Sequence, residues 1–523
     1  MKTDEIAVSG WQEIVMQKDS RIAELEALVK WYEEQLRLAK HRQFGPSSEK
    51  TQMSEQINLF DEAENTADPD LPEPTLTQIT YKRRKRVGKR ADDLSGLPVE
   101  TVEHVLPEEE RICPSCGGRM HAMGHECRRE LKVIPAQVVV VEHKREVYSC
   151  RACEKNSDRV PILKAPLPEP LIKGSLASPS AVAHIMTQKY AMYAPMYRQE
   201  QAWKQQGIFL SRQTMANWVI QCAMDWLMPI YMRLKTCLLI HDILQADETT
   251  VQILREPGRR AQAKSYMWLY RTGGETKTPV ALYEYQQTRH HEHPEAFLKN
   301  FKGYLLTDGL AQYHLLNVTS VGCWAHARRR FDEALKAVEP QKRPGSHAQK
   351  GQDFCNRLFA LERIYADMTP KERHKRRLKE SQPVAEAFFA WAAALRNKTL
   401  PKSALGQALT YACEQKPYLM NIYLDGRLEI SNNRAERGIK PFVMGRKNWL
   451  FCNTPKGAQA SSIVYSIIET AKENGLKPFE YLEFLFQTLP NATVGQIDSL
   501  LPWGEAVPER CRMPMTKEEN ACA

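Results

Sequence analysis

Between residues 243 and 308 the chain consists of short apolar runs with strand-like alternation. Three such runs, one helical pattern and a fourth run follow one another at 243–251, 265–271, 279–285, 294–300 and 303–308. This β-β-β-α-β order predicts an α/β sheet with mixed strand directions. The region therefore belongs to the α/β fold class.

Two of these runs carry an aspartate inside an otherwise apolar segment, Asp247 and Asp308. Burying a carboxylate is costly unless a cation or hydrogen bonds compensate it, so the pair predicts a shared divalent metal site. A two-metal phosphoryl-transfer site needs a third carboxylate, because Mg²⁺ prefers octahedral oxygen ligation. Glu436 is the candidate, since Asn432 and Lys440 lie one helical turn before and after it on the same face. A single glutamate in such a position is more often a helix cap or a surface residue than a metal ligand.

Length and composition limit the function classes. The chain has 523 residues, no long unbroken apolar run and no apolar N-terminal leader. These features predict a soluble, unsecreted protein of about three or four domains. Thirteen cysteines without a signal peptide favour metal ligation over disulfides. The net charge, 73 − 63 = +10, is a modest excess whose meaning depends on where the charges lie.

Two Cys-x-x-Cys pairs predict a zinc-binding module in residues 101–165. Their cysteines are Cys113, Cys116, Cys150 and Cys153. Four thiolates can bind one zinc ion tetrahedrally, and a closed coordination shell indicates a structural ion. The apolar stretch 138–141 is expected to be the strand that carries the chain back between the pairs. A redox dithiol or chance pairs of buried cysteines are the alternatives.

The N-terminal hundred residues predict a coiled coil followed by a linker. Apolar residues between 11 and 39 recur at alternating steps of four and three, which predicts a dimerising coiled coil in 1–45. A single amphipathic helix is the alternative. The linker, 46–100, is acidic and then basic. Its basic run can contact DNA phosphates without sequence specificity. A solvated charge run is the alternative. The run consists of Lys82, Arg83, Arg84, Lys85 and Arg86.

Two helical patterns, at 179–206 and from Ser211 onward, flank a short break in the region 166–235. Ser211 can cap the second helix, and polar side chains on its first two turns can reach base edges or phosphates. Those side chains are Arg212, Gln213 and Asn217. The pattern predicts a helix-turn-helix-like DNA-binding region. A capped helix with a buried Trp218 is, however, common in any helical domain.

Five ordered segments carry a family resemblance: Gln245–Thr249, Leu306–Gly309, Gly322–Phe331, Asn432–Arg437 and Gly445–Phe451. With them, the chain resembles the DDE transposases of the insertion-sequence-sixty-six family over nearly its whole length. The resemblance implies a ribonuclease-H-like core whose acidic triad is Asp247, Asp308 and Glu436. Members often have Asp-Asn-Asn before the glutamate, whereas Ser431 here precedes the two asparagines and leaves the triad intact.

The spacing of the triad implies an inserted domain. The interval from Asp308 to Glu436 is 436 − 308 = 128 residues, longer than a compact core needs. The core is therefore expected in 236–345 and 421–475, a helical insertion in 346–420 and a C-terminal helical segment in 476–523. The cationic run within the insertion, from Lys371 to Lys379, suits either DNA contact or a solvated face.

The resemblance implies an enzyme that binds the terminal repeats of an insertion sequence and catalyses strand cleavage and transfer. Expected cofactors are two catalytic Mg²⁺ ions, with Mn²⁺ as a substitute, and one structural zinc. Expected partners are double-stranded DNA, a second copy of the chain and small accessory proteins, in the bacterial cytoplasm at the nucleoid. Further candidates for phosphate binding are His326, Arg437, Lys440, Arg446 and Lys447. A repressor or architectural protein with an inactive nuclease fold, and a host nuclease, are the competing classes.

Overall fold

The computed structural model describes residues 138–149, 162–166, 169–274 and 276–514, and parts of a helix between residues 16 and 37. The chain divides into two compact units, 70–144 and the remainder. The four candidate zinc ligands Cys113, Cys116, Cys150 and Cys153 lie outside the described residues, as do the whole linker 46–100 and its basic run Lys82, Arg83, Arg84, Lys85 and Arg86.

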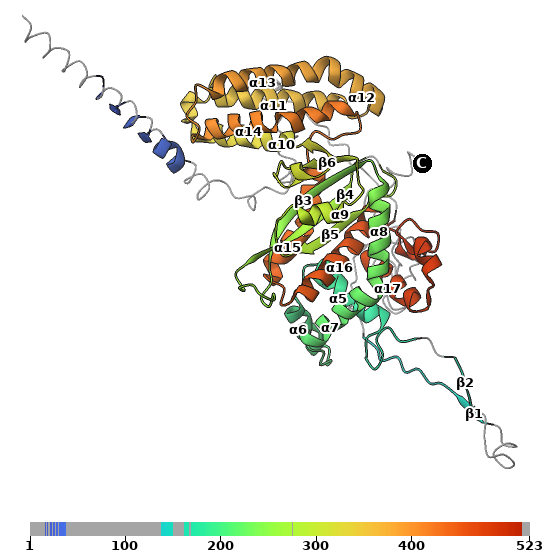
Figure 1. The fold of residues 1–523 in the computed structure, drawn as a ribbon. Coiled ribbons are helices and arrows are strands. Elements are labelled where there is room, and N and C mark those ends of the chain that lie inside the picture. Colours follow the sequence, from blue (N-terminus) through green and yellow to red (C-terminus); the bar gives the residue numbers. More distant parts are fainter. Residues whose placement is uncertain are drawn as a thin grey trace, which may run out of the picture. The chain divides into compact units, whose positions relative to one another are not determined.

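Within the described chain, five strands form one mixed sheet in the order β5-β4-β3-β6-β7 (Figure 1). They are β3 (Ile243–Gln252), β4 (Lys264–Thr272), β5 (Ala281–Gln286), β6 (Tyr304–Thr307) and β7 (Thr319–Gly322). β3, β4 and β5 are antiparallel neighbours, whereas β6 runs parallel to β3 and β7 parallel to β6. Helix α9 (Glu292–Phe297) precedes β6. The predicted mixed α/β sheet is confirmed, and β7 adds a strand that the sequence pattern did not predict.

Three helices pack on this sheet: α8 (Met228–Ile240), α15 (Asn433–Trp449) and α16 (Pro455–Glu473). Helix α16 covers the edge strand β5 and is buried along most of its length. The hydroxyls of Ser466 and Thr470 accept hydrogen bonds from the backbone N–H groups of Tyr283 (2.7 Å) and Ala281 (3.1 Å). These bonds satisfy donors that an edge strand would otherwise leave unpaired.

The helical region before the sheet contains α5 (Pro179–Tyr190), α6 (Met196–Gln205) and α7 (Arg212–Cys222). The predicted single pattern 179–206 is two helices, because Pro195 has no N–H to donate to the carbonyl of Ala191 and disfavours helical backbone at Ala194. Ser211 caps α7 as predicted, accepting a hydrogen bond from the Thr214 N–H at 3.1 Å. α7 continues through a π-helical turn, η3 (Ala223–Leu227), into α8.

A bundle of helices follows β7 (Figure 1). It consists of α10 (Trp324–Ala337), α11 (His347–Ile364), α12 (Pro370–Arg376), the π-helical turn η6 (Arg377–Ser381), α13 (Gln382–Arg396) and α14 (Ala404–Leu419). Its core contains aromatic side chains in tilted and edge-to-face contact, among them Trp324, Phe331 and Phe388. Helix α14 also packs against β7, which joins the bundle to the edge of the sheet.

The expectation of a strand at 138–141 is wrong. The valines there are exposed, and no described strand runs beside them to supply backbone hydrogen bonds. The strand of this region is β1 (Val147–Ser149), which pairs antiparallel with β2 (Ile162–Lys164). Near the C-terminus, α17 (Pro478–Thr488) packs on α5 and α16. Among the described helices, none combines the length and the apolar character that crossing a membrane requires.

Candidate catalytic and metal site

Strands β3 and β6 bring the two predicted aspartates to the same level of the sheet. Their parallel register pairs Gln245 with Leu306, an offset of 306 − 245 = 61 residues. Asp247 and Asp308 are separated by the same interval, 308 − 247 = 61, so they are neighbours across the two strands where β6 ends. Gly309 forms the turn after Asp308 with a φ of +91°, a backbone conformation that favours glycine.

Glu248 joins the two aspartates as a further carboxylate. One carboxylate oxygen from each of Asp247, Glu248 and Asp308 lies within 4.8 Å of the other two. The Tyr313 hydroxyl donates to Glu248 Oε2 at 2.7 Å, and the Arg289 guanidinium donates to Oε1. Glu248 was not predicted, because strand alternation places adjacent residues on opposite faces.

The electrostatics of this carboxylate cluster favour a bound cation. Burial raises the pKa of Asp247 well above its usual range, and the charges of Glu248, Asp308 and Glu436 raise it further. Burial and Asp308 also raise the pKa of Glu248, although Arg289 opposes this. A divalent cation would remove this repulsion, and an oxygen-only ligand set of this kind fits Mg²⁺ or Mn²⁺.

Glu436, on the first turn of α15, faces the start of α10. Its Oε2 accepts a hydrogen bond from Arg329 Nη2 at 3.3 Å. Its Oε1 lies 3.7 Å from His326 Nδ1 and accepts no hydrogen bond from any described residue, although Glu436 is only 5% exposed. Burial raises the pKa of Glu436, and Arg329 acts in the opposite direction. The structure therefore places Glu436 beside the predicted His326.

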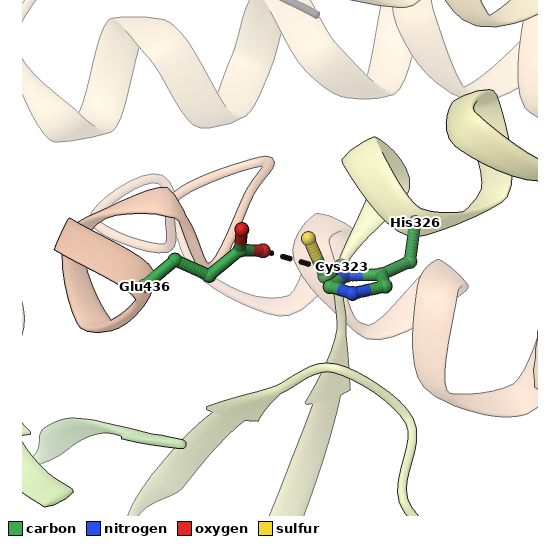
Figure 2. Close-up of side chains that lie close together, drawn as sticks. All are labelled: Cys323, His326 and Glu436. Atoms are coloured by element: carbon green, nitrogen blue, oxygen red, sulfur yellow. Dashed lines mark ion pairs between the residues drawn. The ribbon is translucent and has the colours of Figure 1, made fainter. Parts of the chain in front are cut away.

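Cys323 completes a second group of possible ligands with His326 and Glu436 (Figure 2). One ligand atom from each of the three lies within 4.8 Å of the other two. Burial and the Glu436 charge raise the pKa of the Cys323 thiol to about 12, while burial and Arg329 lower the pKa of His326 to about 4. Cys323 was missed in the sequence, although its Cys-x-x-His spacing at the start of a helix was visible.

Asn432 fixes the start of α15 against the sheet and against Cys323. Its side-chain amide donates to the carbonyl oxygen of Ala246 at 2.9 Å, one residue before Asp247. Its backbone N–H donates to Cys323 Sγ at 3.1 Å. These two bonds hold the first turn of α15, and with it Glu436, next to β3 and α10.

The predicted DNA-contact residues of α7 lie on its exposed face. Arg212, Gln213 and Asn217 are exposed, whereas Trp218, on the opposite side, is 8% exposed and packs in the core. Gln213 Nε2 donates to Asn217 Oδ1 at 3.0 Å. The polar side chains are accessible to a ligand, but they do not lie in the carboxylate site.

The cationic candidates of α15 differ in their surroundings. Arg437 and Lys447 are exposed, and Lys440 is half-buried. Arg446 is half-buried and donates to the Thr249 and Thr250 hydroxyls at 3.2 and 2.9 Å. The guanidinium of Arg446 thus ties α15 to β3.

A polar pocket of about 410 Å³ adjoins the start of α15. Ser431, Asn433 and residues of the bundle line it, together with two glutamates, Glu362 and Glu429. Among the described residues, its lining includes five arginines: Arg373, Arg377, Arg427, Arg434 and Arg437. Four of these arginines already have partners within the protein. Arg377 pairs with Glu362, Arg434 with Glu429 and Arg427 with Asp425, and Arg373 donates to backbone carbonyls. Of the five, the exposed Arg437 is the residue suited to phosphate contact.

Family models match most of the chain. The model of the Transposase IS66 family covers residues 174–460, and that of the IS66 C-terminal element covers 466–503. The zinc-finger binding domain of transposase IS66 matches 110–154, which supports a bound zinc in that segment. The model named Transposase C of IS166 homeodomain matches 31–102.

Similar proteins occur in Sinorhizobium fredii (strain NBRC 101917 / NGR234). The uncharacterized protein y4qI is 28% identical over 519 residues, which cover 93% of this chain and 89% of that protein. The uncharacterized protein y4jD is 28% identical over 415 residues, covering 76% of this chain and 79% of that protein. Because the main family model spans more than half of the chain and includes the carboxylate site, this chain belongs to the IS66 family of transposases.

Proposed function

We propose that this transposase cleaves and joins DNA strands by divalent-metal-dependent phosphoryl transfer at Asp247, Asp308 and Glu436. The observation that carries the proposal is the register of β3 and β6, which sets Asp247 beside Asp308 on the side where α15 presents Glu436. A mixed sheet with three antiparallel strands, two further parallel strands and a helix that carries a glutamate on its first turn is consistent with a ribonuclease-H-like core.

In this proposal Asp247 and Asp308 hold two Mg²⁺ ions, for which Mn²⁺ can substitute, and Glu436 completes the ligand set. The bound ions would supply a deprotonated water or DNA 3′-hydroxyl as nucleophile and stabilise the leaving oxygen. The protein's own part is positioning. Asn432 holds the first turn of α15, and Tyr313 and Arg289 hold the Glu248 carboxylate beside the site.

DNA contact is proposed along the cationic surfaces. Arg437 lines the pocket, is exposed and follows Glu436 on α15, so it can bind a phosphate that flanks a reacting strand. The exposed face of α7 and the basic run 82–86 would bind the element's terminal repeats. Cys113, Cys116, Cys150 and Cys153 are the proposed zinc ligands, and a coiled coil in 1–45 would pair two chains.

The test is cleavage and strand joining on a supercoiled plasmid that carries the element's own ends, with Mg²⁺. Asp247→Asn and Asp308→Asn should each lower the rate of end-specific nicking by about 100-fold or more, because each removes a charge that stabilises the reacting complex. Asp367→Asn, at an exposed carboxylate of the bundle, should nick like the wild type.

Two outcomes would contradict the proposal. Wild-type rates in both site variants would show that these carboxylates do not hold the catalytic ions. Binding of the ends without any nicking that depends on Asp247 or Asp308 would favour a repressor or architectural role. Repeating the assay with the neighbouring gene products would separate that role from a missing accessory protein.

A further inference from the structure

The group formed by Cys323, His326 and Glu436 differs in chemistry from the carboxylate cluster. It offers a sulfur, a nitrogen and an oxygen ligand, whereas Asp247, Glu248 and Asp308 offer oxygen alone. Cys323 is 0% and Glu436 5% exposed, so both lie in the protein interior. Figure 2 shows the three side chains converging from the β7–α10 junction and from the first turn of α15.

The spacing of the ligand atoms suits one metal ion. His326 Nδ1 and Glu436 Oε1 are 3.7 Å apart, and the ligand atoms of all three residues lie within 4.8 Å of one another. Around a tetrahedral zinc with bonds of about 2.0 Å, two such ligands are about 3.3 Å apart. A movement of a few tenths of an ångström would therefore bring both onto a common ion. Glu436 Oε1, buried and without a hydrogen bond from any described residue, points into this space.

The donor types select the class of ion. Thiolate and imidazole are ligands of borderline ions such as Zn²⁺ and Co²⁺, whereas Mg²⁺ takes oxygen. We propose that Cys323, His326 and Glu436 form a second metal site, which binds Zn²⁺ or a similar transition-metal ion and is distinct from the carboxylate cluster. This site also lies outside the segment that matches the family's zinc finger, 110–154.

Arg329 takes the place of the cation when no metal is bound. Its Nη2 donates to Glu436 Oε2 at 3.3 Å, and its Nη1 lies 3.2 Å from His326 Nε2. A guanidinium can only donate, so Nε2 accepts this bond and the imidazole proton lies on Nδ1. Metal binding through Nδ1 releases that proton or moves it to Nε2, and the thiol proton goes to solvent. Arg329, whose side chain is 44% exposed, has room to turn away.

The consequence for activity rests on the proposed function. A Zn²⁺ ion bound by Glu436 together with Cys323 and His326 would compete with Mg²⁺ for this carboxylate. Zn²⁺ should therefore inhibit Mg²⁺-dependent nicking. The concentration that halves the rate should rise when Cys323 is replaced, each variant being compared with its own rate without Zn²⁺.

Metal binding itself is measured on the full-length protein. Metal-stripped protein is dialysed against Zn²⁺, and bound zinc per chain is determined by mass spectrometry of the metal. Cys323→Ser should bind one ion fewer than the wild type, because the site loses its thiolate, a ligand that zinc favours. His326→Gln should show the same loss. Cys355→Ser, at another fully buried cysteine, is the matched control and should bind as the wild type does.

Co²⁺ provides a second readout. The difference spectrum between cobalt-loaded wild type and Cys323→Ser should contain a sulfur-to-cobalt charge-transfer band. The difference spectrum between wild type and the control Cys355→Ser should contain no such band. Equal zinc content and identical cobalt spectra in wild type and Cys323→Ser, with native circular dichroism in both, would overturn the proposal. Asp308→Asn separates the two claims, since it should lose nicking and retain the additional zinc. A wild type that binds one zinc ion more than Cys323→Ser but does not nick DNA would contradict the proposed function and leave the proposed metal site supported.

Discussion

Acidic side chains inside this protein have different partners, and the partners determine whether the carboxylate charge is compensated. Glu248 is paired with Arg289 and Tyr313, and Glu436 is paired with Arg329. Glu284, on β5, is half-buried, and its buried Oε2 accepts no hydrogen bond from any described residue. Burial raises its pKa from 4.5 to about 7, although Lys235 opposes the shift.

Glu284→Gln should stabilise the protein at pH 8. Burial raises the pKa of Glu284 in the folded state above its unfolded value. Below about pH 4.5 the side chain is neutral in both states and does not change the free energy of unfolding. As the pH rises to about 7 and beyond, the charged form increasingly lowers that free energy. The gain at pH 8 should approach about 3 kcal/mol, from 1.36 kcal/mol per pKa unit, and vanish near pH 4.5. Urea unfolding at both pH values measures it. An equal gain in stability at pH 4.5 and pH 8 would contradict the raised pKa of Glu284. An equal gain in the exposed control Glu295→Gln would contradict it as well.

Gly309→Ala should disturb Asp308 through the backbone. Gly309 has a φ of +91°, and an added Cβ would lie 2.8 Å from Gln415 Oε1. The strain is about 1–3 kcal/mol, and a shift of Asp308 should lower end-specific nicking by about 10-fold or more. Gly495→Ala is the control, because its Cβ would meet no described atom within 4 Å. Equal nicking rates in the two variants would show that the turn does not position Asp308.

The acids of the proposed triad could be found in the sequence because each stands inside an apolar or helical pattern. Most of the surrounding residues could not. Glu248 is adjacent to Asp247, and period-two alternation assigns it to the other face. Cys323 had a local signal in its Cys-x-x-His spacing at the start of α10. Arg289 and Tyr313 reach the site through loops and turns whose path depends on tertiary packing, and no local pattern specifies their contacts.

At the scale of elements, one cationic segment serves several structural purposes. In the run from Lys371 to Lys379, Arg377 on η6 is buried and donates through Nε and Nη2 to Glu362 on α11, at 2.8 and 2.6 Å. Arg373 donates to the backbone carbonyls of Tyr365 and Gly426. The two alternatives for this run, DNA contact and a solvated face, therefore do not describe these two arginines.

Arg377→Ala should destabilise the bundle by about 3–5 kcal/mol, because it leaves the Glu362 carboxylate buried without its cation. The adjacent Arg376→Ala should cost no more than about 1 kcal/mol, since its ion pair with Glu380 is partly exposed. Thermal unfolding of the two variants measures the difference. Equal midpoints would show that the buried pair is not structurally important.

Elements were predictable where periodicity was long and unbroken. The strands around Asp247 and Asp308 emerged from alternation and apolar runs, and the cap at Ser211 from its residue type. β6 and β7 each have four residues, but β6 contains an apolar run, whereas Val321 is the one large apolar residue of β7, whose place is set by pairing with β6. The break at Pro195 shows that one proline overrides an otherwise helical pattern.

For the whole molecule, the N-terminal helix indicates how two chains could associate. Its described apolar positions on the predicted seam are all exposed: Ile22, Leu25, Val29, Tyr32 and Leu36. Trp31 and Arg37, off the seam, contact Lys402 and Glu339 of the same chain, whereas the exposed apolar stripe is expected to pair with a second helix. A pair of chains would let one complex hold both ends of an element.

Leu25→Lys with Leu36→Lys should convert a dimer to monomers in sedimentation velocity, because charge on the seam prevents helix pairing. Glu26→Gln with Glu33→Gln changes the net charge by the same +2 on exposed positions off the seam and should leave the dimer intact. Deletion of residues 1–45 should likewise abolish paired-end complexes and spare binding to a single end. Unchanged sedimentation in the lysine variant would exclude this seam as the dimer interface.

The most direct measurement compares the wild type with Glu436→Gln on DNA that carries the element's ends, in Mg²⁺, following binding, nicking and joining together. The substitution keeps the volume of the side chain and removes its charge. The variant should bind the ends within about threefold of the wild type and lose about 100-fold or more of nicking, with no joining. Nicking and joining at wild-type rates would contradict the assignment of Glu436, and with it the three-carboxylate account of catalysis.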